Sequence, residues 1–513
     1  MAAIVPPSTR PVDPSHAVDA RLVSPVVTSA LPLRWWLALG LLPVIVLAIR
    51  ALGFLPSVID WDESLYLIQA REWLRGGWPL VAAWDMHPIG APAMFAGAMA
   101  ALGESIFAVR LLGTLAVATT GWGLFFVVRA AGGAPATGYA AALLYAGHSM
   151  VPGGVSVNAE LLYAPFTTAA IALAIGRAPT WPRLTGVGLL VGWALLIKPV
   201  AAPEGCLAFA LLVGPAWWRG AVPWGRLAGF AAAYAALCAL PTFGFGVTYA
   251  LRGELDAYLD GSFFAPFRYA QGTAVVDAAW RVASAMGHML WLFLLAGAAV
   301  LWARRSAAVV IGAFWLLAGC VAVAGPAQFF AHYFLIWLAP LSLLAACGIA
   351  ALARRRAWPA PALALLVGLV ALDPWRIDTA TRLGRGAVIL APDVPARIAA
   401  RIAADLPAGA SIFIPNYQPV VYVLAGAAIP TRFPFPIHLT GTYARLAGNS
   451  TDDEVGRILG TQPRFIVVDR DNWGAMRPAA ATAIAAALEA SYGLAEVFND
   501  TGNQIELWRL RGN

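Results

Sequence analysis

The sequence predicts a mainly α-helical protein that crosses a membrane many times and ends in a small α/β domain. Hydrophobic residues make up 60% of the 513 residues and charged residues only 12%, whereas roughly a quarter of the residues are charged in an ordinary soluble domain. The mean hydropathy is +0.72. Apolar segments long enough to cross ~30 Å of hydrocarbon recur along most of the chain. Lipid is therefore the expected solvent for most of the molecule.

The basic residues argue against nucleic-acid binding in spite of the net charge of +7. They stand singly or in twos and threes between apolar runs and form no basic stripe, which a nucleic-acid-binding surface would require. The four cysteines all lie in apolar segments. No disulfide framework and no zinc site is therefore indicated.

The same basic residues predict the orientation of the spans, because Lys and Arg collect in cytoplasmic connections. Five short connections carry them: Arg129; Arg177 with Arg183; Arg219 with Arg226; Arg304 with Arg305; and Arg354 to Arg356. If all five are cytoplasmic, the N-terminus is inside, the C-terminal region is outside, and about eleven spans result. They run approximately over residues 35–55, 106–128, 137–153, 161–176, 185–199, 201–217, 227–249, 284–303, 307–325, 333–353 and 358–373.

Three domains follow from this pattern. Residues 1–33 are predicted to be a disordered cytoplasmic tail, and residues 34–373 a transmembrane domain. Its first outer loop, about 56–104, contains an amphipathic stretch from Ser64 to Arg75 and an apolar stretch from Pro88 to Leu102, both expected to be helices lying in the membrane interface. In residues 374–513 short β-rich runs alternate with helical patterns, which predicts an α/β domain outside the membrane.

An acidic cluster directly follows the first span and contains Asp60, Asp62 and Glu63. We expect Asp62 to cap a helix that starts near Glu63, where free backbone N–H groups stabilise an anion. A carboxylate held there could take a proton from a hydroxyl or bind a cation. The alternative is a capped, solvated acidic turn without chemistry.

Two further charged residues lie at the predicted outer ends of spans. Glu160 follows Asn158, and a carboxylate so near hydrocarbon is costly unless it faces a polar cavity or the headgroup region. Lys198 ends a very apolar span on the side that the positive-inside rule disfavours. It either binds an anionic ligand or extends toward lipid phosphates.

Other polar residues fall on the same predicted face. His87, and His332 beside Tyr333, are candidate ligands or hydrogen-bonded interfacial residues. Arg71 and Arg75 stand four residues apart on one helix face, where they could hold a phosphate or face water and lipid headgroups. Residues from distant parts of the chain thus share one side of the membrane under a topology derived without them.

Several short segments recur in the order of a known family over roughly residues 35–350. They are Asp62-Glu63-Ser64-Leu65-Tyr66, the run from Ala70 to Pro79, His87-Pro88, Gly103 to Arg110, Glu160, Lys198-Pro199 and His332-Tyr333. This set resembles the GT-C membrane glycosyltransferases. Within that superfamily it is similar to the protein O-mannosyltransferases, the lipid A aminoarabinose transferases and the bacterial lipopolysaccharide-core transferases.

The resemblance implies an inverting enzyme of the bacterial inner membrane that moves one sugar from a polyprenyl-phosphate carrier to a glycolipid, polysaccharide or protein at the periplasmic or outer face. Asp62 would be the base. Glu63 and Glu160 would shape the sugar or acceptor pocket, and Asp62 and Glu160 are the candidates to bind a divalent cation, if one is used. The pocket would also include Tyr66, Asn158 and Tyr333.

The donor phosphate would be neutralised by Lys198, His332, Arg71 or His87. Many relatives have Lys-Pro-Pro or His-Pro-Pro after the interfacial helix, where this chain has His87-Pro88-Ile89. Where a relative uses that Lys for the phosphate, the role must pass here to His87, Lys198 or an arginine.

Two other classes of function stay open from the residues alone. A transporter should carry its ionisable groups near the bilayer midplane, often with inverted repeats. The groups here gather at the outer ends of spans, and no internal repeat is visible. A non-catalytic subunit of envelope assembly could use its outer domain to bind a partner.

Overall fold

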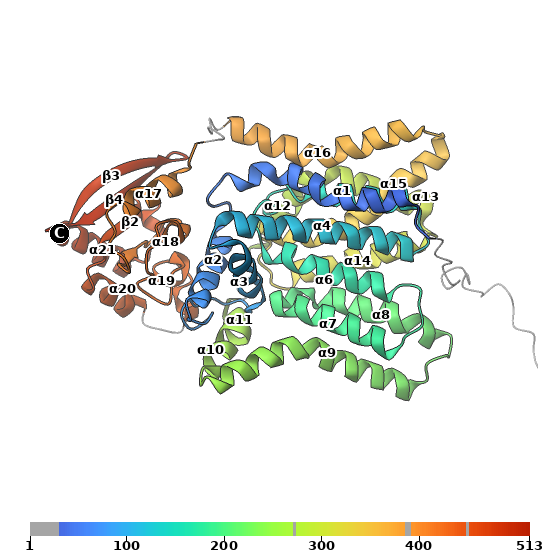
Figure 1. Ribbon diagram of the computed structural model, residues 1–513, viewed down its shortest axis with the longest axis horizontal. Helices are drawn as coiled ribbons and strands as arrows, with labels where there is room; N and C mark the ends of the chain where they lie inside the picture. Colours follow the sequence, from blue (N-terminus) through green and yellow to red (C-terminus); the bar gives the residue numbers. More distant parts are fainter. Residues whose placement is uncertain (1–29, 270–272, 385–390, 448–450, 513) are drawn as a thin grey trace, which may run out of the picture.

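The computed structural model describes residues 30–269, 273–384, 391–447 and 451–512. A bundle of long helices fills most of the molecule, and a small sheet with its helices lies at one end of the bundle (Figure 1). The predicted tail falls almost wholly outside the described residues.

Seven helices or helix pairs are long and apolar enough to cross a membrane, and the bent pair α12–α13 would raise the number to eight. They are α1 (Leu33–Arg50) with η3 (Ala51–Phe54), α4 (Ile106–Ala130), η4 (Pro199–Ala201) with α8 (Ala202–Trp218), α9 (Trp224–Leu251), α14 (Ala307–Ala324), η6 (Ala331–Trp337) with α15 (Leu338–Arg356), and α16 (Ala360–Gly384). The chain is therefore a multi-pass membrane protein.

Other predicted spans contain shorter helices, namely α5 (Pro135–His148), α6 (Ala159–Ala174) and α7 (Trp181–Ile197). The span expected at 284–303 is not one straight helix. α12 (Val275–His288) and α13 (Leu290–Ala303) meet at 79°. The count of eleven spans stays a prediction.

The first outer loop forms α2 (Trp61–Leu74) and α3 (Gly90–Leu102). α3 buries one side, including Phe95 and Met99. α2 differs from the amphipathic helix that its sequence predicts, because every residue from Glu63 to Arg71 is buried. It lies between the bundle and the sheet-containing end of the molecule and contacts both α3 and α18 (Val420–Leu424) (Figure 1). The tertiary structure covers the face that the sequence leaves polar.

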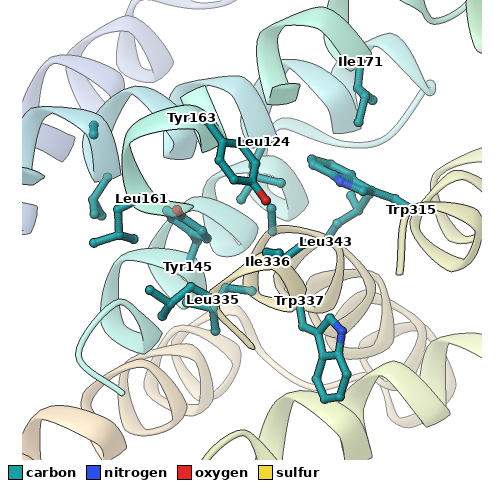
Figure 2. Packing of buried hydrophobic residues seen from close by; sticks show 14 of the residues in the cluster. Leu124, Tyr145, Leu161, Tyr163, Ile171, Trp315, Leu335, Ile336, Trp337 and Leu343 are labelled. Atoms are coloured by element: carbon teal, nitrogen blue, oxygen red, sulfur yellow. The ribbon is translucent and has the colours of Figure 1, made fainter. Parts of the chain in front are cut away.

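A continuous apolar core holds the bundle helices together. Tyr145, Tyr163 and Trp315, from α5, α6 and α14, meet the 3₁₀ helix η6 at Leu335 and Ile336 (Figure 2). Between helices in lipid, such packing stabilises mainly through van der Waals contact, because lipid tails are as apolar as the buried side chains. The core fixes the position of η6, the helix that carries His332.

The C-terminal part contains a four-stranded sheet in the order β1-β2-β4-β3. The short β1 (Ile412–Phe413) pairs in parallel with β2 (Phe465–Asp469), and β4 (Asn503–Leu510) pairs antiparallel with β2 and with β3 (Tyr492–Asp500). The sequence pattern predicts a strand at 496–498, and the strand found there, β3, is longer, with nine residues. The surrounding helices are α17 (Val394–Ala403), α18, α19 (Pro436–Leu439), η7 (Ala444–Ala447), α20 (Thr451–Gly460), η8 (Trp473–Ala475) and α21 (Pro478–Ser491).

The segment that follows α9, residues 255–269, returns to the same end of the bundle. It forms α10 (Leu255–Leu259), the π-helix η5 (Asp260–Phe264) and α11 (Ala265–Tyr269). Gly261 lies so close to the first outer loop that a Cβ there would be 2.9 Å from the carbonyl oxygen of Asp85. Segments from three outer loops therefore meet at the end that carries the sheet.

η6 leads directly into α15, so the packing of α15 against α13 helps to hold η6 and can be tested. A Cβ on Gly348 would lie 1.9 Å from the carbonyl oxygen of Leu295. Gly348→Ala should therefore cost roughly 1–3 kcal/mol through overpacking, seen as a lower melting temperature in detergent. Gly368→Ala on α16 meets no atom within 4 Å and is the matched control, expected to be neutral or stabilising. Equal melting temperatures for both variants would contradict this packing.

Candidate active site

The acidic cluster is organised by Asp60, and the expected cap at Asp62 is wrong. α2 begins at Trp61, and the N-cap residue is Asp60, whose side chain accepts a hydrogen bond from the backbone N–H of Asp62 at 3.0 Å. A carboxylate at this position is stabilised by the unpaired N–H groups of the first turn. Its other oxygen accepts a hydrogen bond from Asn158 Nδ2 at 3.2 Å. Asp60 thus joins two outer loops and places Asp62 in the first turn of α2.

His332 lies against both aspartates. Its Nδ1 is 3.6 Å from Asp60 Oδ2, and its Nε2 is 3.8 Å from Asp62 Oδ2. One ligand atom from each of the three residues fits within 4.8 Å, and in the described part of the chain this is the one cluster spaced to hold a metal ion. The mixed oxygen and nitrogen donor set suits a divalent cation. The structure groups Asp62 with Asp60 and His332 here, and not with Glu160.

The surroundings shift the pKa values of Asp60 and Asp62 in opposite directions. Burial alone would raise the pKa of Asp60, but the neighbouring His332, together with the Asp62 N–H, holds that pKa below its usual value. Burial, and next the negative charge of Asp60, raise the pKa of Asp62. Two neighbouring carboxylates with divergent pKa values are a common arrangement for acid–base work. Asp62 is the more basic of the two and the better proton acceptor.

Lys198 and Glu160 form a buried ion pair at 2.5 Å between Nζ and Oε1. Lys198 directly follows α7, and Glu160 lies in the first turn of α6. The ammonium group also lies 4.4 Å from the centre of the Tyr333 ring, and that ring is 4.9 Å from the ring of His332. The structure therefore brings the predicted Lys198, Glu160 and Tyr333 together beside the His332 cluster.

His87 has a partner that the sequence interpretation missed. Asp85 is buried, and its carboxylate lies 3.0 Å from His87 Nδ1. Burial would lower the pKa of His87, but the charge and hydrogen bond of Asp85 outweigh it and raise that pKa. The cationic form is thus favoured, with Nδ1–H donating to Asp85. The spacing Asp85-Met86-His87 was the available sequence signal. The Tyr66 ring meets the His87 ring edge to face at 6.2 Å.

Two predicted site residues make other contacts. Glu63 is buried and pairs with Arg110, with Nε 3.1 Å from Oε1. Arg71 is fully buried, and its Nη1 donates to the Tyr422 carbonyl of the C-terminal part at 2.8 Å. Its Nη2 pairs with Glu72. Glu63 therefore serves as a counter-ion, and Arg71 connects α2 to α18.

Arg50 and Arg110 anchor the second predicted outer loop, residues 151–160. Arg50, the last residue of α1, donates to the carbonyl oxygens of Gly154 and Val155, both at 2.9 Å. Arg110 donates to the same Val155 carbonyl at 3.1 Å. Gly153 has a φ of +83°, and a Cβ there would lie 2.7 Å from the His332 backbone. The loop therefore contacts η6 directly and carries Asn158 to Asp60.

The C-terminal part covers the first outer loop. The backbone N–H of Trp84 donates to the Arg432 carbonyl at 2.7 Å, and the Arg432 side chain donates to Leu80 O at 2.8 Å. The rings of Trp61 and Phe435 lie 5.8 Å apart. The C-terminal part thus contacts Trp61, within the acidic cluster, and Trp84, close to His87 in the chain.

An apolar cavity of about 790 Å³ adjoins the cationic side of the site. Its lining includes Pro88 and Pro199, which directly follow His87 and Lys198 in the chain. The remaining wall comes mainly from α9, α10 and η5, with Phe243, Tyr258 and Phe263. A long apolar group could therefore lie beside the two cationic side chains.

The Arg110–Glu63 pair can be tested through stability. Breaking one member of a buried ion pair costs roughly 3–5 kcal/mol, because the other charge stays buried without a partner. Arg110→Met should therefore lower the melting temperature in detergent, and Glu63→Leu combined with Arg110→Met should recover part of the loss. An unchanged melting temperature for Arg110→Met would contradict the anchoring role.

Residues 86–243 match the protein family described as dolichyl-phosphate-mannose-protein mannosyltransferase. No curated protein matches the chain by sequence. The matched segment includes His87, Glu160 and Lys198, and it ends within α9.

The fold is similar to that of ArnT from Cupriavidus metallidurans, with a TM-score of 0.63 for the apo state and 0.61 for the complex with undecaprenyl phosphate. Both comparisons have 14% identity and cover 93% of this chain and 98% of ArnT. Arabinofuranosyltransferase AftD from Mycobacteria has a TM-score of 0.52 and 18% identity, over 94% of this chain and 40% of AftD.

The oligosaccharyltransferase of Archaeoglobus fulgidus, solved with Zn and sulfate, has a TM-score of 0.52 and 13% identity, over 91% of this chain and 72% of that protein. The family match and the shared fold confirm the resemblance that the sequence indicates. Residues 86–243 are thus similar to a mannosyltransferase family, and the whole chain shares the fold of membrane glycosyltransferases of the GT-C type.

Proposed function

We propose that the protein transfers a single sugar from a polyprenyl-phosphate carrier to an acceptor hydroxyl, with inversion at the anomeric carbon. The observation that carries this proposal is a site with a basic carboxylate, Asp62, and two cationic side chains, His87 and Lys198, next to an apolar cavity. Undecaprenyl phosphate bound to the structurally similar ArnT supports the same class of donor.

The phosphate side of the site would consist of His87 and Lys198. Each cation has a buried carboxylate neighbour, Asp85 or Glu160, so the site offers oriented N–H donors more than net positive charge. Such preorganised donors stabilise charge that develops on a leaving group by several kcal/mol in a water-poor site. Arg71 is a weaker candidate, because its contacts hold α2 to the C-terminal part.

The isoprenoid tail of the donor would occupy the cavity beside Pro88 and Pro199. The lining is overwhelmingly apolar and lies on α9, whose residues are mostly exposed, as expected of a helix that faces lipid. The tail could thus reach the cavity from the bilayer without crossing water. The carrier phosphate would then stand at the level of His87 and Lys198.

In the proposed reaction Asp62 accepts the proton of the acceptor hydroxyl. The acceptor oxygen forms a bond to the anomeric carbon, and the bond from that carbon to the phosphate oxygen breaks on the opposite face. Its electron pair leaves with polyprenyl phosphate. His332 and Asp60 would orient Asp62. Tyr66, Tyr333 and Asn158 would border the sugar.

Asp60, Asp62 and His332 could also hold a divalent cation between them. Such a cation would neutralise the two carboxylates and help to bind oxygen groups of the substrates. Glu160 would take no part, because it pairs with Lys198.

We place the site at the outer face of a bacterial inner membrane. The five basic clusters all fall in or beside the connections α4–α5, α6–α7, α8–α9, α13–α14 and α15–α16. These connections lie at the ends of the helices that are remote from α2 and the C-terminal part (Figure 1). The positive-inside rule then assigns the site to the outer side.

Asp62→Asn tests the base. The variant should bind undecaprenyl phosphate like the wild type but lose transfer by roughly 10²–10⁴-fold, the usual weight of a general base. Mass spectrometry measures whether the variant restores the envelope glycan of a deletion strain. Transfer by the purified protein is measured separately, with and without a chelator. Glu104→Gln, an exposed carboxylate paired with Arg75, is the control. Wild-type transfer by Asp62→Asn would remove Asp62 from this role.

The Asp85–His87 pair predicts a pH dependence of donor binding. The raised pKa keeps His87 cationic above the ordinary imidazole value of 6.5, and the cation is lost as the pH rises through the raised pKa. Asp85→Asn removes the cause of the increase and leaves the opposing effect of burial. The alkaline loss of undecaprenyl phosphate binding should therefore move to lower pH. A midpoint that stays in place would exclude His87 as the phosphate ligand.

A further inference from the structure

A second cavity lies on the opposite, carboxylate side of the site. Its volume is about 240 Å³, and its wall is formed by α12, by Val151 and Pro152 of the second outer loop, and by residues 329–331 and 334 beside η6. The lining is mostly apolar. It shares no residue with the cavity beside Pro88 and Pro199.

α12 has the properties of a helix that lies on a membrane surface. It is strongly amphipathic, buries none of its residues and meets the apolar helix α13 at 79°. Val275, Val276 and Trp280 are 85%, 80% and 71% exposed. A helix with exposed apolar residues and a polar face is expected to lie in the interface between headgroups and acyl chains. The cavity therefore opens beside lipid.

The rings of Phe330 and His332 lie between this cavity and the proposed base. Phe330 lines the cavity, and its ring stacks on the ring of His332 at 5.8 Å. His332 in turn lies 3.8 Å from Asp62. A molecule held in the cavity by its apolar part would thus bring its polar end close to Asp62.

The cavity also contains a cation, Arg281, for which the described part of the chain offers no carboxylate partner. Arg281 lines it, lies 5.4 Å from the centre of the Phe330 ring and donates to the Gln328 carbonyl at 2.7 Å. Within the described residues Arg281 makes no ion pair, whereas His87 and Lys198 each have an acidic neighbour. A guanidinium in this setting suits an anionic headgroup.

We propose that the acceptor is a membrane lipid with an anionic headgroup and a free hydroxyl, and that its acyl chain enters the cavity under α12. This inference rests on the proposed function and names the acceptor class. The headgroup would lie at Arg281, and the hydroxyl would pass Phe330 to reach Asp62. The hydroxyl proton goes to Asp62, its oxygen bonds to the anomeric carbon, and polyprenyl phosphate leaves on the other side of the site.

Photo-cross-linking tests the cavity directly. The purified protein is placed in phosphatidylcholine nanodiscs that contain phosphatidylglycerol with a diazirine on one acyl chain. Cross-links should map to the cavity wall, at residues such as Phe329 and Phe334. Ala285→Trp places an indole in the cavity and should remove most of these cross-links, because the acyl chain then has no room there. Ala283→Trp, on the exposed side of α12, should leave them unchanged.

The headgroup is tested by Arg281→Gln. It should lower cross-linking of the anionic probe about fivefold, the weight of one cation near a charged lipid, and leave that of a diazirine phosphatidylcholine unchanged. Equal cross-linking of the cavity wall in the wild type and Ala285→Trp, or cross-links that never map to the cavity wall, would overturn the proposal.

The product provides an independent test. Lipid extracts of a deletion strain should lack a glycosylated lipid that returns with the wild-type gene and with Ala283→Trp, but not with Ala285→Trp. Loss of sugar from proteins or polymers alone, with lipid extracts unchanged, would overturn the lipid acceptor. Binding of undecaprenyl phosphate separates the two proposals: a wild type that does not bind it fails as a transferase of this kind, whereas normal binding without capture of the probe refutes only the acceptor.

Discussion

The site depends on the pair of buried arginines that hold the second outer loop. Arg50 and Arg110 donate to the carbonyl oxygens of Gly154 and Val155, groups that would be costly to bury without donors. Once the loop is fixed, Asn158 reaches Asp60, and Gly153 contacts the backbone of His332. Glu63 balances part of the positive charge. The position of the proposed base thus follows from charge-assisted hydrogen bonds that lie beneath it.

A second constraint is the pairing of each cation in the site with a buried carboxylate. Lys198 with Glu160 and His87 with Asp85 keep the desolvation of isolated charges from opposing folding. The same pairing holds the N–H donors in place before any substrate arrives. Arg281, at the edge of the second cavity, lacks such a partner in the described part of the chain. That difference is why an anionic ligand is inferred there and oriented donors are inferred at His87 and Lys198.

The sequence predicts most residues of the candidate site but not the contacts between them. The sequence indicates Glu160, Lys198, His332 and Tyr333 one by one. The structure joins them through the Lys198–Glu160 ion pair, the Lys198 ammonium over the Tyr333 ring, and the edge-to-face contact of Tyr333 with His332. Asp60 was noted only as one of three acids, although it is the residue that caps α2. Arg50 was not singled out, because one arginine at the end of an apolar span has no distinctive pattern. Glu63 and Arg71 carry family resemblance, yet their contacts give them structural roles.

By itself, the sequence determined that the chain lives in lipid, that its polar residues gather at one end of the spans, and that their order resembles the GT-C superfamily. These properties are encoded locally, in hydropathy, in basic connections and in short motifs. Only the tertiary structure decided which carboxylate faces which cation, that α2 is buried on both sides, and that two apolar cavities flank the acidic cluster. Apart from the contact of Asp85 with His87, which are two residues apart, those features arise between residues tens to hundreds of positions apart, and no local pattern records such contacts. The sequence therefore indicates the acidic loop after the first span as a candidate site. Which contacts Asp60, Asp62 and Glu63 each make is decided by the fold.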